Sequence, residues 1–193
     1  DLVFAYDAHG LEMVSSTDGR GGATTFDYDA NRRQTRMTLP GGGHYDYAYD
    51  CCALSSLTDP GGAVMTLERD ALLRITRIVD PAARATALAY DADGQLASRT
   101  DPMSRTTRFA SDEAGRITRV TSPLGGHVDY GRDDRGLVAS LTDQRGKTTT
   151  ISYDNRGLLS SQTDPSNQQA FSLTRDGLGR VTARTNARGG HVG

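Results

Sequence analysis

The chain has 193 residues, of which 36% are hydrophobic and 6% aromatic, with no tryptophan, and this apolar content is thin for a solid globular core. The formal net charge is −2 and no basic block stands out, so the sequence argues against nucleic-acid binding. No stretch approaches the ~20 apolar residues that a membrane-spanning helix needs.

A short motif returns along the whole chain. Residues Tyr90–Pro102 read YDADGQLASRTDP, and residues Tyr153–Pro165 read YDNRGLLSSQTDP. The aspartate after the tyrosine has equivalents 20 to 22 residues apart, at Asp7, Asp29, Asp50, Asp70, Asp91, Asp112, Asp133, Asp154 and Asp176. Tyrosine precedes five of them, as Tyr6, Tyr28, Tyr49, Tyr90 and Tyr153, and arginine or serine precedes the others. Such a fixed period predicts a repeat architecture.

Each repeat begins with a predicted β-strand that leads into the motif aspartate. A large apolar or aromatic residue stands three positions before every one of these aspartates, and a small or polar residue stands two positions before it. The large residues are Phe4, Phe26, Tyr47, Leu67, Leu88, Phe109, Tyr130, Ile151 and Leu173. This alternation predicts a strand with one buried face. We expect the aromatic members to stack across strands in an apolar seam.

A turn is predicted at each motif aspartate. Glycine follows three residues later in six repeats, as Gly10, Gly94, Gly115, Gly136, Gly157 and Gly179. Asp-x-x-Gly is typical of a type I turn, in which the aspartate accepts hydrogen bonds from backbone N–H groups just after it. The glycine then adopts the left-handed conformation of a hairpin that closes with a bulge.

A second strand and a second turn complete each repeat. The strands are short and rich in β-branched residues, for example ITRVT at Ile117–Thr121. The turns include DPGG at Asp59–Gly62, DQRG at Asp143–Gly146 and NARG at Asn186–Gly189, although Leu39 replaces the aspartate in one. Proline takes the second turn position in six repeats, where its fixed φ suits the corner; these residues are Pro40, Pro60, Pro81, Pro102, Pro123 and Pro165.

The predicted fold is all-β, with two short strands in each ~21-residue repeat. Residues 1–193 form a single array of about nine repeats, with no helical period and no linker. Hairpin chemistry at both corners favours an antiparallel β-meander ribbon. A parallel β-solenoid with one repeat in each coil is the alternative. The chain opens in mid-pattern, and its final RGGHVG matches the start of LGGHVDYGRD at Leu124–Asp133, so we expect a piece of a longer polypeptide.

The repeats resemble a known family. YDADGQLASRTDPMSRTTRFASDEAGRI and YDNRGLLSSQTDP are similar to the Rhs, or tyrosine-aspartate (YD), repeats of bacterial Rhs polymorphic toxins, Tc toxin C components, wall-associated bacterial proteins and animal teneurins. Period, both turns and the aromatic position agree over the whole chain. The repeats at Asp70, Asp112, Asp133 and Asp176 depart from the pattern because they lack the tyrosine, which weakens those single repeats.

The resemblance implies the curved wall of a large hollow β-shell, which in bacterial members encloses a toxic C-terminal domain until delivery. The implied partners are the remainder of the shell, the enclosed toxin domain, and secretion-system spike or chaperone proteins. The implied location is a secreted or cell-surface effector made in the bacterial cytoplasm. The family's autoproteolytic DPxGL-type sequence has no match, since Ala63 follows Asp59–Gly62. We therefore assign no cleavage residue, no catalytic residue and no cofactor, and we expect no enzyme.

Metal binding and acid–base catalysis are less favoured than this structural role. Asp91–Gly94 and the stretch from Asp27 to Asn31 resemble fragments of calcium loops, but neither completes a calcium-binding pattern, so turn capping is favoured over a metal site. The carboxylate pairs Asp112-Glu113 and Asp133-Asp134 lie at turns, where pKa tuning for catalysis is difficult. His44, His127 and His191 share one repeat position and follow Gly-Gly, which indicates a copied template rather than a site.

Two further features leave alternatives open. Cys51 and Cys52 are adjacent; free thiols in a turn are favoured over a vicinal redox switch, because a disulfide between neighbours is strained. The aromatic row could bind sugars or peptides, so a cell-surface adhesion or carbohydrate-binding module, with a glycan as partner, is the alternative function.

Overall fold

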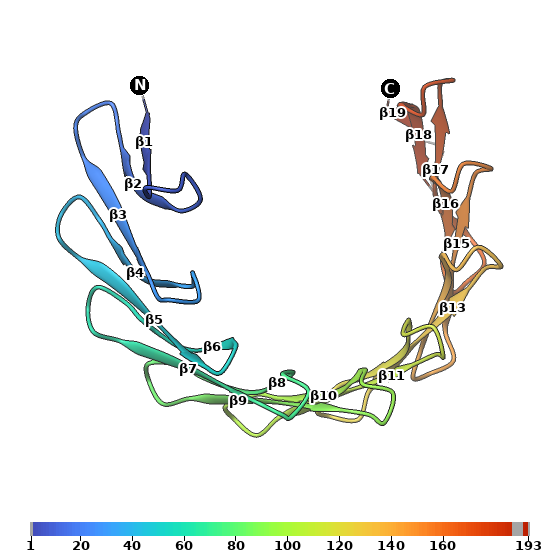
Figure 1. Ribbon diagram of the computed structural model, residues 1–193. Helices are drawn as coiled ribbons and strands as arrows, with labels where there is room; N and C mark the ends of the chain where they lie inside the picture. Colours follow the sequence, from blue (N-terminus) through green and yellow to red (C-terminus); the bar gives the residue numbers. More distant parts are fainter. Residues whose placement is uncertain (1, 187–190, 193) are drawn as a thin grey trace. The chain divides into compact units, whose positions relative to one another are not determined.

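The computed structural model describes residues 2–186 and 191–192, and within them all regular secondary structure is β-strand (Figure 1). The strands are β1 (Val3–Tyr6), β2 (Met13–Thr17), β3 (Ala23–Tyr28), β4 (Gln34–Thr38), β5 (His44–Asp50), β6 (Ala53–Thr58), β7 (Val64–Arg69), β8 (Ile75–Val79), β9 (Ala85–Tyr90), β10 (Leu96–Thr100), β11 (Thr106–Ser111), β12 (Ile117–Thr121), β13 (His127–Arg132), β14 (Val138–Asp143), β15 (Thr148–Tyr153), β16 (Leu159–Thr163), β17 (Gln169–Arg175), β18 (Val181–Asn186) and β19 (His191–Val192). The predicted turn at Asn186–Gly189 lies mostly outside the described residues.

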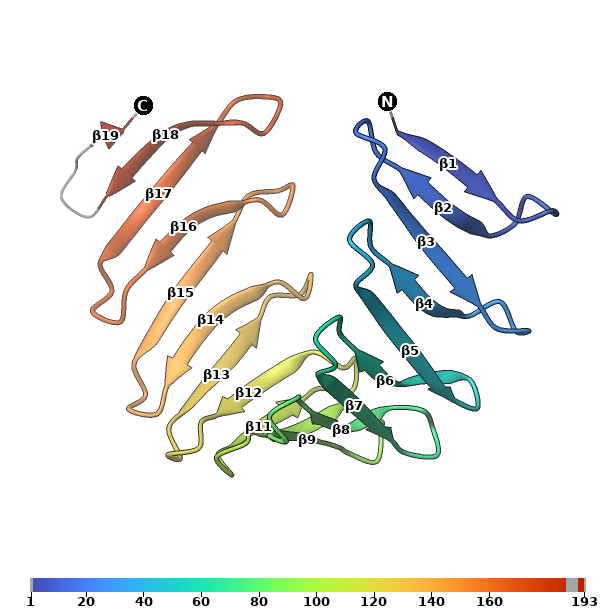
Figure 2. The same ribbon diagram turned by 90° about the vertical axis from the view of Figure 1, so that its left-hand side faces the viewer.

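The chain forms two compact units, Asp1–Leu88 with Thr100–Ser104, and Ala89–Arg99 with Arg105–Gly193. In the first unit each strand from β1 to β8 pairs antiparallel with the strand that follows it in sequence. In the second unit the same holds from β11 to β19, and Figure 2 shows β13 to β17 side by side in chain order. The all-β meander is therefore confirmed, and the parallel solenoid is wrong.

A bulge recurs beside the first turn of the repeat. In the hairpin of β15 and β16, Ser152 pairs with Ser161 and Tyr153 pairs with Leu159, so the register shifts by one residue. The same shift occurs in the hairpins β1–β2, β3–β4, β5–β6, β7–β8, β11–β12, β13–β14 and β17–β18. Such a bulge increases the local twist and re-aims the side chain next to it. Here that side chain is the residue before the motif aspartate.

The predicted buried face is only partly realised. None of the described residues is fully buried, although strands such as β3 and β15 alternate between exposed and half-buried side chains. Periodicity indicates which side chains share a face, but it cannot tell whether another layer covers that face. Within each unit the strands form one layer (Figure 2). Without a second packed layer, ladder hydrogen bonds and side-chain contacts along the sheet carry more of the stability.

Candidate functional site

The residues of the repeat signature form a regular series of turns at one end of the strands in each unit. At Asp154 the N–H of Gly157 donates to the aspartate carbonyl at 3.0 Å, and the N–H of Asp154 donates to the carbonyl of Leu158 at 2.8 Å. The Oδ1 atom of Asp154 accepts from the N–H groups of Arg156 and Leu158, both at 2.9 Å. Gly157 has a φ of 78°, a conformation that costs glycine little. One carboxylate oxygen thus caps two backbone donors.

The same turn occurs at most of the predicted positions. The N–H three residues on donates to the aspartate carbonyl at Asp7, Asp29, Asp70, Asp91, Asp112, Asp133, Asp154 and Asp176. The fourth residue is glycine with positive φ at Gly10, Gly94, Gly115, Gly136, Gly157 and Gly179, whereas Arg32 and Leu73 adopt the same conformation in the other two repeats. The second turn repeats this geometry, and it persists at Leu39, where the N–H of Gly42 donates to the Leu39 carbonyl at 2.9 Å.

Asp50 differs from the other eight motif aspartates. It belongs to β5 and pairs with Ala53, and the preceding Tyr49 pairs with Leu54. Cys51 and Cys52 therefore form a two-residue turn, with a φ of 53° at Cys51. Both cysteines are free and exposed. The reason is chain length, because the loop between the paired Tyr49 and Leu54 is one residue shorter than the loop between Tyr153 and Leu159.

The turn hydrogen bonds change the acidity of the aspartates. The N–H of Leu158 is the main cause that lowers the pKa of Asp154, and the N–H of Arg116 has the same effect at Asp112. At Asp176 and Asp70 the pKa is lowered first by a side-chain hydrogen bond, from Arg180 and from Arg74 respectively. Hydrogen bonds to the charged form favour that form. These carboxylates are therefore held ionised as turn caps, not tuned for proton transfer near neutral pH.

The residue before the motif aspartate connects successive repeats. The hydroxyl of Tyr28 donates to the carbonyl of Met13 at 2.9 Å, and Met13 pairs with Tyr6, the equivalent residue of the preceding repeat. Tyr49 donates in the same way to Gln34 at 2.8 Å. We call this hydrogen bond, from the position before the aspartate to the carbonyl 15 or 16 residues earlier, the inter-repeat tie.

Arginine makes the inter-repeat tie where tyrosine is missing. The Nη2 atoms of Arg69, Arg132 and Arg175 donate to the carbonyls of Leu54, Ile117 and Leu159 at 3.2, 3.1 and 3.0 Å. Their Nη1 atoms donate to the fourth residue of their own turns, Leu73, Gly136 and Gly179. Three of the four repeats that lack tyrosine therefore keep the tie through arginine. The Ser111 side chain is too short to span the same distance.

The arginine version has a cost. The Nε atoms of Arg69, Arg132 and Arg175 are buried and have no hydrogen-bond partner among the described residues, and such a donor loses its hydration without compensation. Sequence reasoning missed the tie because tyrosine and arginine look unrelated. A signal was present, since one of these two long donors precedes eight of the nine motif aspartates.

A second row of ties follows the turns themselves. In the second unit, Arg135 donates from Nη1 to the carbonyl of Asp154 at 2.8 Å, and Arg156 donates from Nη1 to Gly177 at 3.1 Å. In the first unit, Arg33 donates to the carbonyl of Cys51 and lies over the ring of Tyr49, 4.6 Å from its centre. These three turns are thus hydrogen-bonded to the turn of the next repeat.

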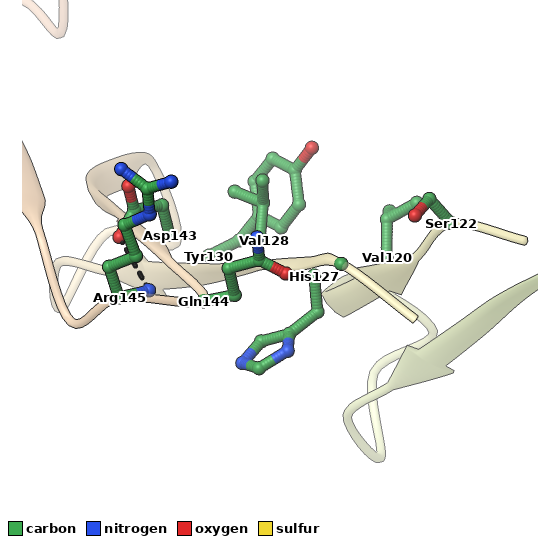
Figure 3. Close-up of a pocket in the computed structure, with 9 residues that line it drawn as sticks. Val120, Ser122, His127, Val128, Tyr130, Asp143, Gln144 and Arg145 are labelled. Carbon is green, nitrogen blue, oxygen red and sulfur yellow. Dashed lines mark hydrogen bonds between the residues drawn. The ribbon is translucent and has the colours of Figure 1, made fainter. Parts of the chain in front are cut away.

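The large residues three positions before the aspartates lie on the same face as the tyrosines, as the strand period requires. Figure 3 shows Val128 and Tyr130 on one side of β13 and His127 on the opposite side. An open depression of about 430 Å³ is lined by Val120, Tyr130 and Arg145 among others, and His127 also borders it. The large residues three positions before the motif aspartates are half-buried, apart from Phe4 on β1, which is 49% exposed.

The predicted histidine position carries a polar cluster. His44 lies 3.5 Å from Asp46, whose Oδ1 accepts from the Nε of Arg36 at 2.6 Å. His127, Asp129 and Arg119 repeat this arrangement in the second unit. The side chain of His191 lies outside the described residues. Among the described residues, no group of three or more histidine, cysteine or acidic side chains is placed to hold a metal ion, and no helix is long and apolar enough to cross a membrane.

Comparisons with known proteins agree with this geometry. The model of the family described as RHS Repeat matches residues 6–44, 90–127, 132–169 and 153–191, which together make up more than half of the chain. No curated protein matches the chain.

Solved structures share the fold. A crystal structure of TcdB2-TccC3 superposes with a TM-score of 0.78 at 16% identity and covers 95% of this chain and 12% of that one. TcdB2-TccC3 without its hypervariable C-terminal region gives 0.64 at 14%, covering 98% and 13%. The Photorhabdus luminescens Tc holotoxin pore gives 0.60 at 12%, covering 96% and 13%. The chain therefore spans about an eighth of the length of these proteins.

Proposed function

This chain belongs to the RHS repeat family, and we propose that it is a non-catalytic wall segment of a β-shell that encloses the C-terminal toxin domain of a bacterial polymorphic toxin. The observation that carries the proposal is the use of the signature residues. The motif aspartates cap their own turns, and the tyrosines and arginines before them donate to the preceding repeat. Because the polar groups of the motif form hydrogen bonds within the sheet, the motif has a structural role.

The single layer also suits a wall. On the face opposite the large apolar residues, the second unit presents polar side chains, among them the small hydroxyls of the paired Ser152, Ser161 and Ser172 and the charged pair Arg119–Asp129. Thr142 and Thr148 pair through their hydroxyls at 2.9 Å on the same face. Small polar side chains give a partly unfolded neighbour little apolar surface on which to condense.

The enclosed domain is proposed from the related structures. One of them is TcdB2-TccC3 without its hypervariable C-terminal region, so that protein has a C-terminal region that can be left out. We extend this organisation to the longer polypeptide that we propose for this chain. Its partners are then the remaining shell, the enclosed domain, and the spike or chaperone proteins that deliver a secreted effector.

Limited proteolysis of the full-length protein, read by mass spectrometry, tests the proposal. If the repeats form a container, the C-terminal domain resists the protease while the repeats are intact. Ile151→Pro removes a ladder donor from β15, a central strand, and should open the wall. The C-terminal domain should then be cut at a rate close to that of the isolated domain.

Gln144→Pro is the matched control. Gln144 occupies the second position of the turn after β14, where six other repeats carry proline, so this variant should protect the domain as the natural protein does. Immediate cleavage of the C-terminal domain in the unmodified protein, with the repeats left whole, would reject enclosure. The adhesion alternative would then be tested by glycan binding and its loss on Tyr→Ala exchange at Tyr28, Tyr49 and Tyr90.

A further inference from the structure

The adjacent thiols of Cys51 and Cys52 lie at an unusual place in the repeat. They are the two central residues of the tight turn between β5 and β6, and both are exposed. The neighbouring Cys51 side chain raises the pKa of the Cys52 thiol. The turn therefore places two accessible thiols on adjacent residues, which is the arrangement that an intramolecular thiol reaction needs.

We propose that Cys51 and Cys52 form a reversible thiol-disulfide exchange site for low-molecular-weight disulfides of the glutathione class. A thiolate of Cys51 attacks one sulfur of the disulfide, forms a mixed disulfide and releases one glutathione thiolate. The thiolate of Cys52 then attacks the Cys51 sulfur, closes the Cys51–Cys52 disulfide and releases the second glutathione. The two protons lost from the cysteines pass to the two glutathione thiolates, and the small disulfide is the oxidant.

The assignment of Cys51 as the first nucleophile rests on the surrounding surface. A depression of about 400 Å³ lies beside Cys51 and is lined by Leu54, Leu67, Arg69 and Leu73 among others. It offers space for the tripeptide of the mixed disulfide, and Asp50, Glu68 and Asp70 line it together with Arg69. Cys52 does not line this depression, so it is placed to resolve the mixed disulfide rather than to hold it.

The closed form should be easy to reduce. Consecutive Cα atoms are about 3.8 Å apart, which is shorter than the ~4.4–6.8 Å of an ordinary disulfide, so the ring is strained and more reducible. Closing the shortest loop that a chain can make also removes little entropy from the unfolded state. The bond therefore acts as a labile modification and adds no stability. The neighbouring Cys51 side chain raises the pKa of Cys52, so exchange should accelerate as the pH rises above neutral.

The test is incubation of the intact protein with glutathione disulfide, followed by peptide mass mapping. The natural protein should lose two hydrogen atoms within the peptide that contains both cysteines, keep no glutathione, and become resistant to iodoacetamide. Excess reduced glutathione should restore the thiols. The melting temperature of the oxidised form should not exceed that of the reduced form, which distinguishes a labile bond from a stabilising one.

Two single variants assign the roles. Cys52→Ser should retain one glutathione at Cys51, because no second thiol can release it, whereas Cys51→Ser should acquire glutathione more slowly. Stable glutathione adducts on the natural protein without ring closure would overturn the proposal. So would disulfide-linked dimers, or a protein that reacts with iodoacetamide at both cysteines but not with glutathione disulfide. None of these three results bears on the proposed wall function, which proteolysis tests separately.

Discussion

The hydroxyl of Tyr153 donates a hydrogen bond to the backbone carbonyl of Val138 at 2.8 Å, across 15 residues of sequence. Val138 is the residue that pairs with Arg132, the equivalent of Tyr153 in the preceding repeat. Each tie therefore ends where the preceding one begins. In a repeat protein, stability is approximately a sum of terms within repeats and between neighbours, and this bond belongs to the second kind.

Tyr153→Phe tests the inter-repeat tie by removal of a single oxygen atom. A hydrogen bond of this kind contributes ~0.5–1.5 kcal/mol, so we expect the local free energy of opening to fall by about 1 kcal/mol. Backbone amides of β14 to β16 in the intact protein should exchange roughly fivefold faster, as read by hydrogen-exchange mass spectrometry.

Tyr130→Phe is the control for this experiment. Tyr130 lies on the same face two strands away, and no hydrogen bond from its hydroxyl is found among the described residues. The backbone amides of the Tyr130→Phe variant should exchange at the same rate as those of the natural protein. Equal acceleration in both variants would mean that loss of any hydroxyl on this face loosens the sheet, and the tie would have no special role.

Arg132→Tyr tests whether arginine and tyrosine are interchangeable at this position. Tyrosine should keep the bond to Ile117 and remove the buried Nε that lacks a partner, so exchange around β12 to β14 should stay the same or slow. Arg132→Leu removes the donor altogether and should accelerate exchange. If the tyrosine variant opens as readily as the leucine variant, the second bond, from Arg132 to the carbonyl of Gly136 at 3.0 Å, is the one that matters.

The sequence alone predicts the strands, both turns and the antiparallel order, because Asp-x-x-Gly fixes a local hairpin wherever it occurs. It does not predict the inter-repeat tie made by Arg69, Arg132 and Arg175. A motif defined by tyrosine treats arginine at that position as a departure from the pattern. The turn at Cys51 also escapes the pattern. Its signal is a step of 20 residues from Asp50 to Asp70 where most steps are 21, a difference too small to interpret without the register.

Leu73→Gly should stabilise the first unit. Leu73 has a φ of 63° at a position that glycine takes in six other repeats, and this conformation costs a residue with a Cβ ~1–2 kcal/mol. Replacing leucine by glycine removes this cost, but glycine is more flexible in the unfolded chain, which lowers the free energy of unfolding by ~0.5–1 kcal/mol. We expect a net gain below about 1 kcal/mol, measured as a higher melting temperature.

Gly146→Ala is the reverse change. Gly146 has a φ of 74°, and a Cβ placed there would meet nothing within 4 Å, so any loss comes from the backbone alone, at about 1 kcal/mol. Gly41→Ala is the matched control, because Gly41 has equal space and no positive φ, and it should be neutral. A loss at Gly41 equal to that at Gly146 would contradict the conformational explanation.

Stability should fall steeply in acid. Turn hydrogen bonds lower the folded-state pKa of Asp29, Asp112 and Asp154 below 3.8. A group with a lowered pKa stabilises the fold above its unfolded pKa of ~3.9, and this contribution is lost as the pH falls through the folded value. Stability should therefore be level from neutral pH to about pH 5 and decline below pH 4, as measured by circular dichroism during acid titration.

Asp154→Asn assigns part of that decline to one turn. Asparagine still accepts backbone hydrogen bonds through its Oδ1 but carries no charge, so the variant should be less stable at pH 7 and should lose less on acidification. Asp134→Asn is the control, because the exposed Asp134 side chain accepts no hydrogen bond from the described residues. If both variants reduce the loss of stability in acid equally, net charge rather than turn capping governs the transition. Repulsion among the positive charges that remain at low pH depends on every carboxylate alike.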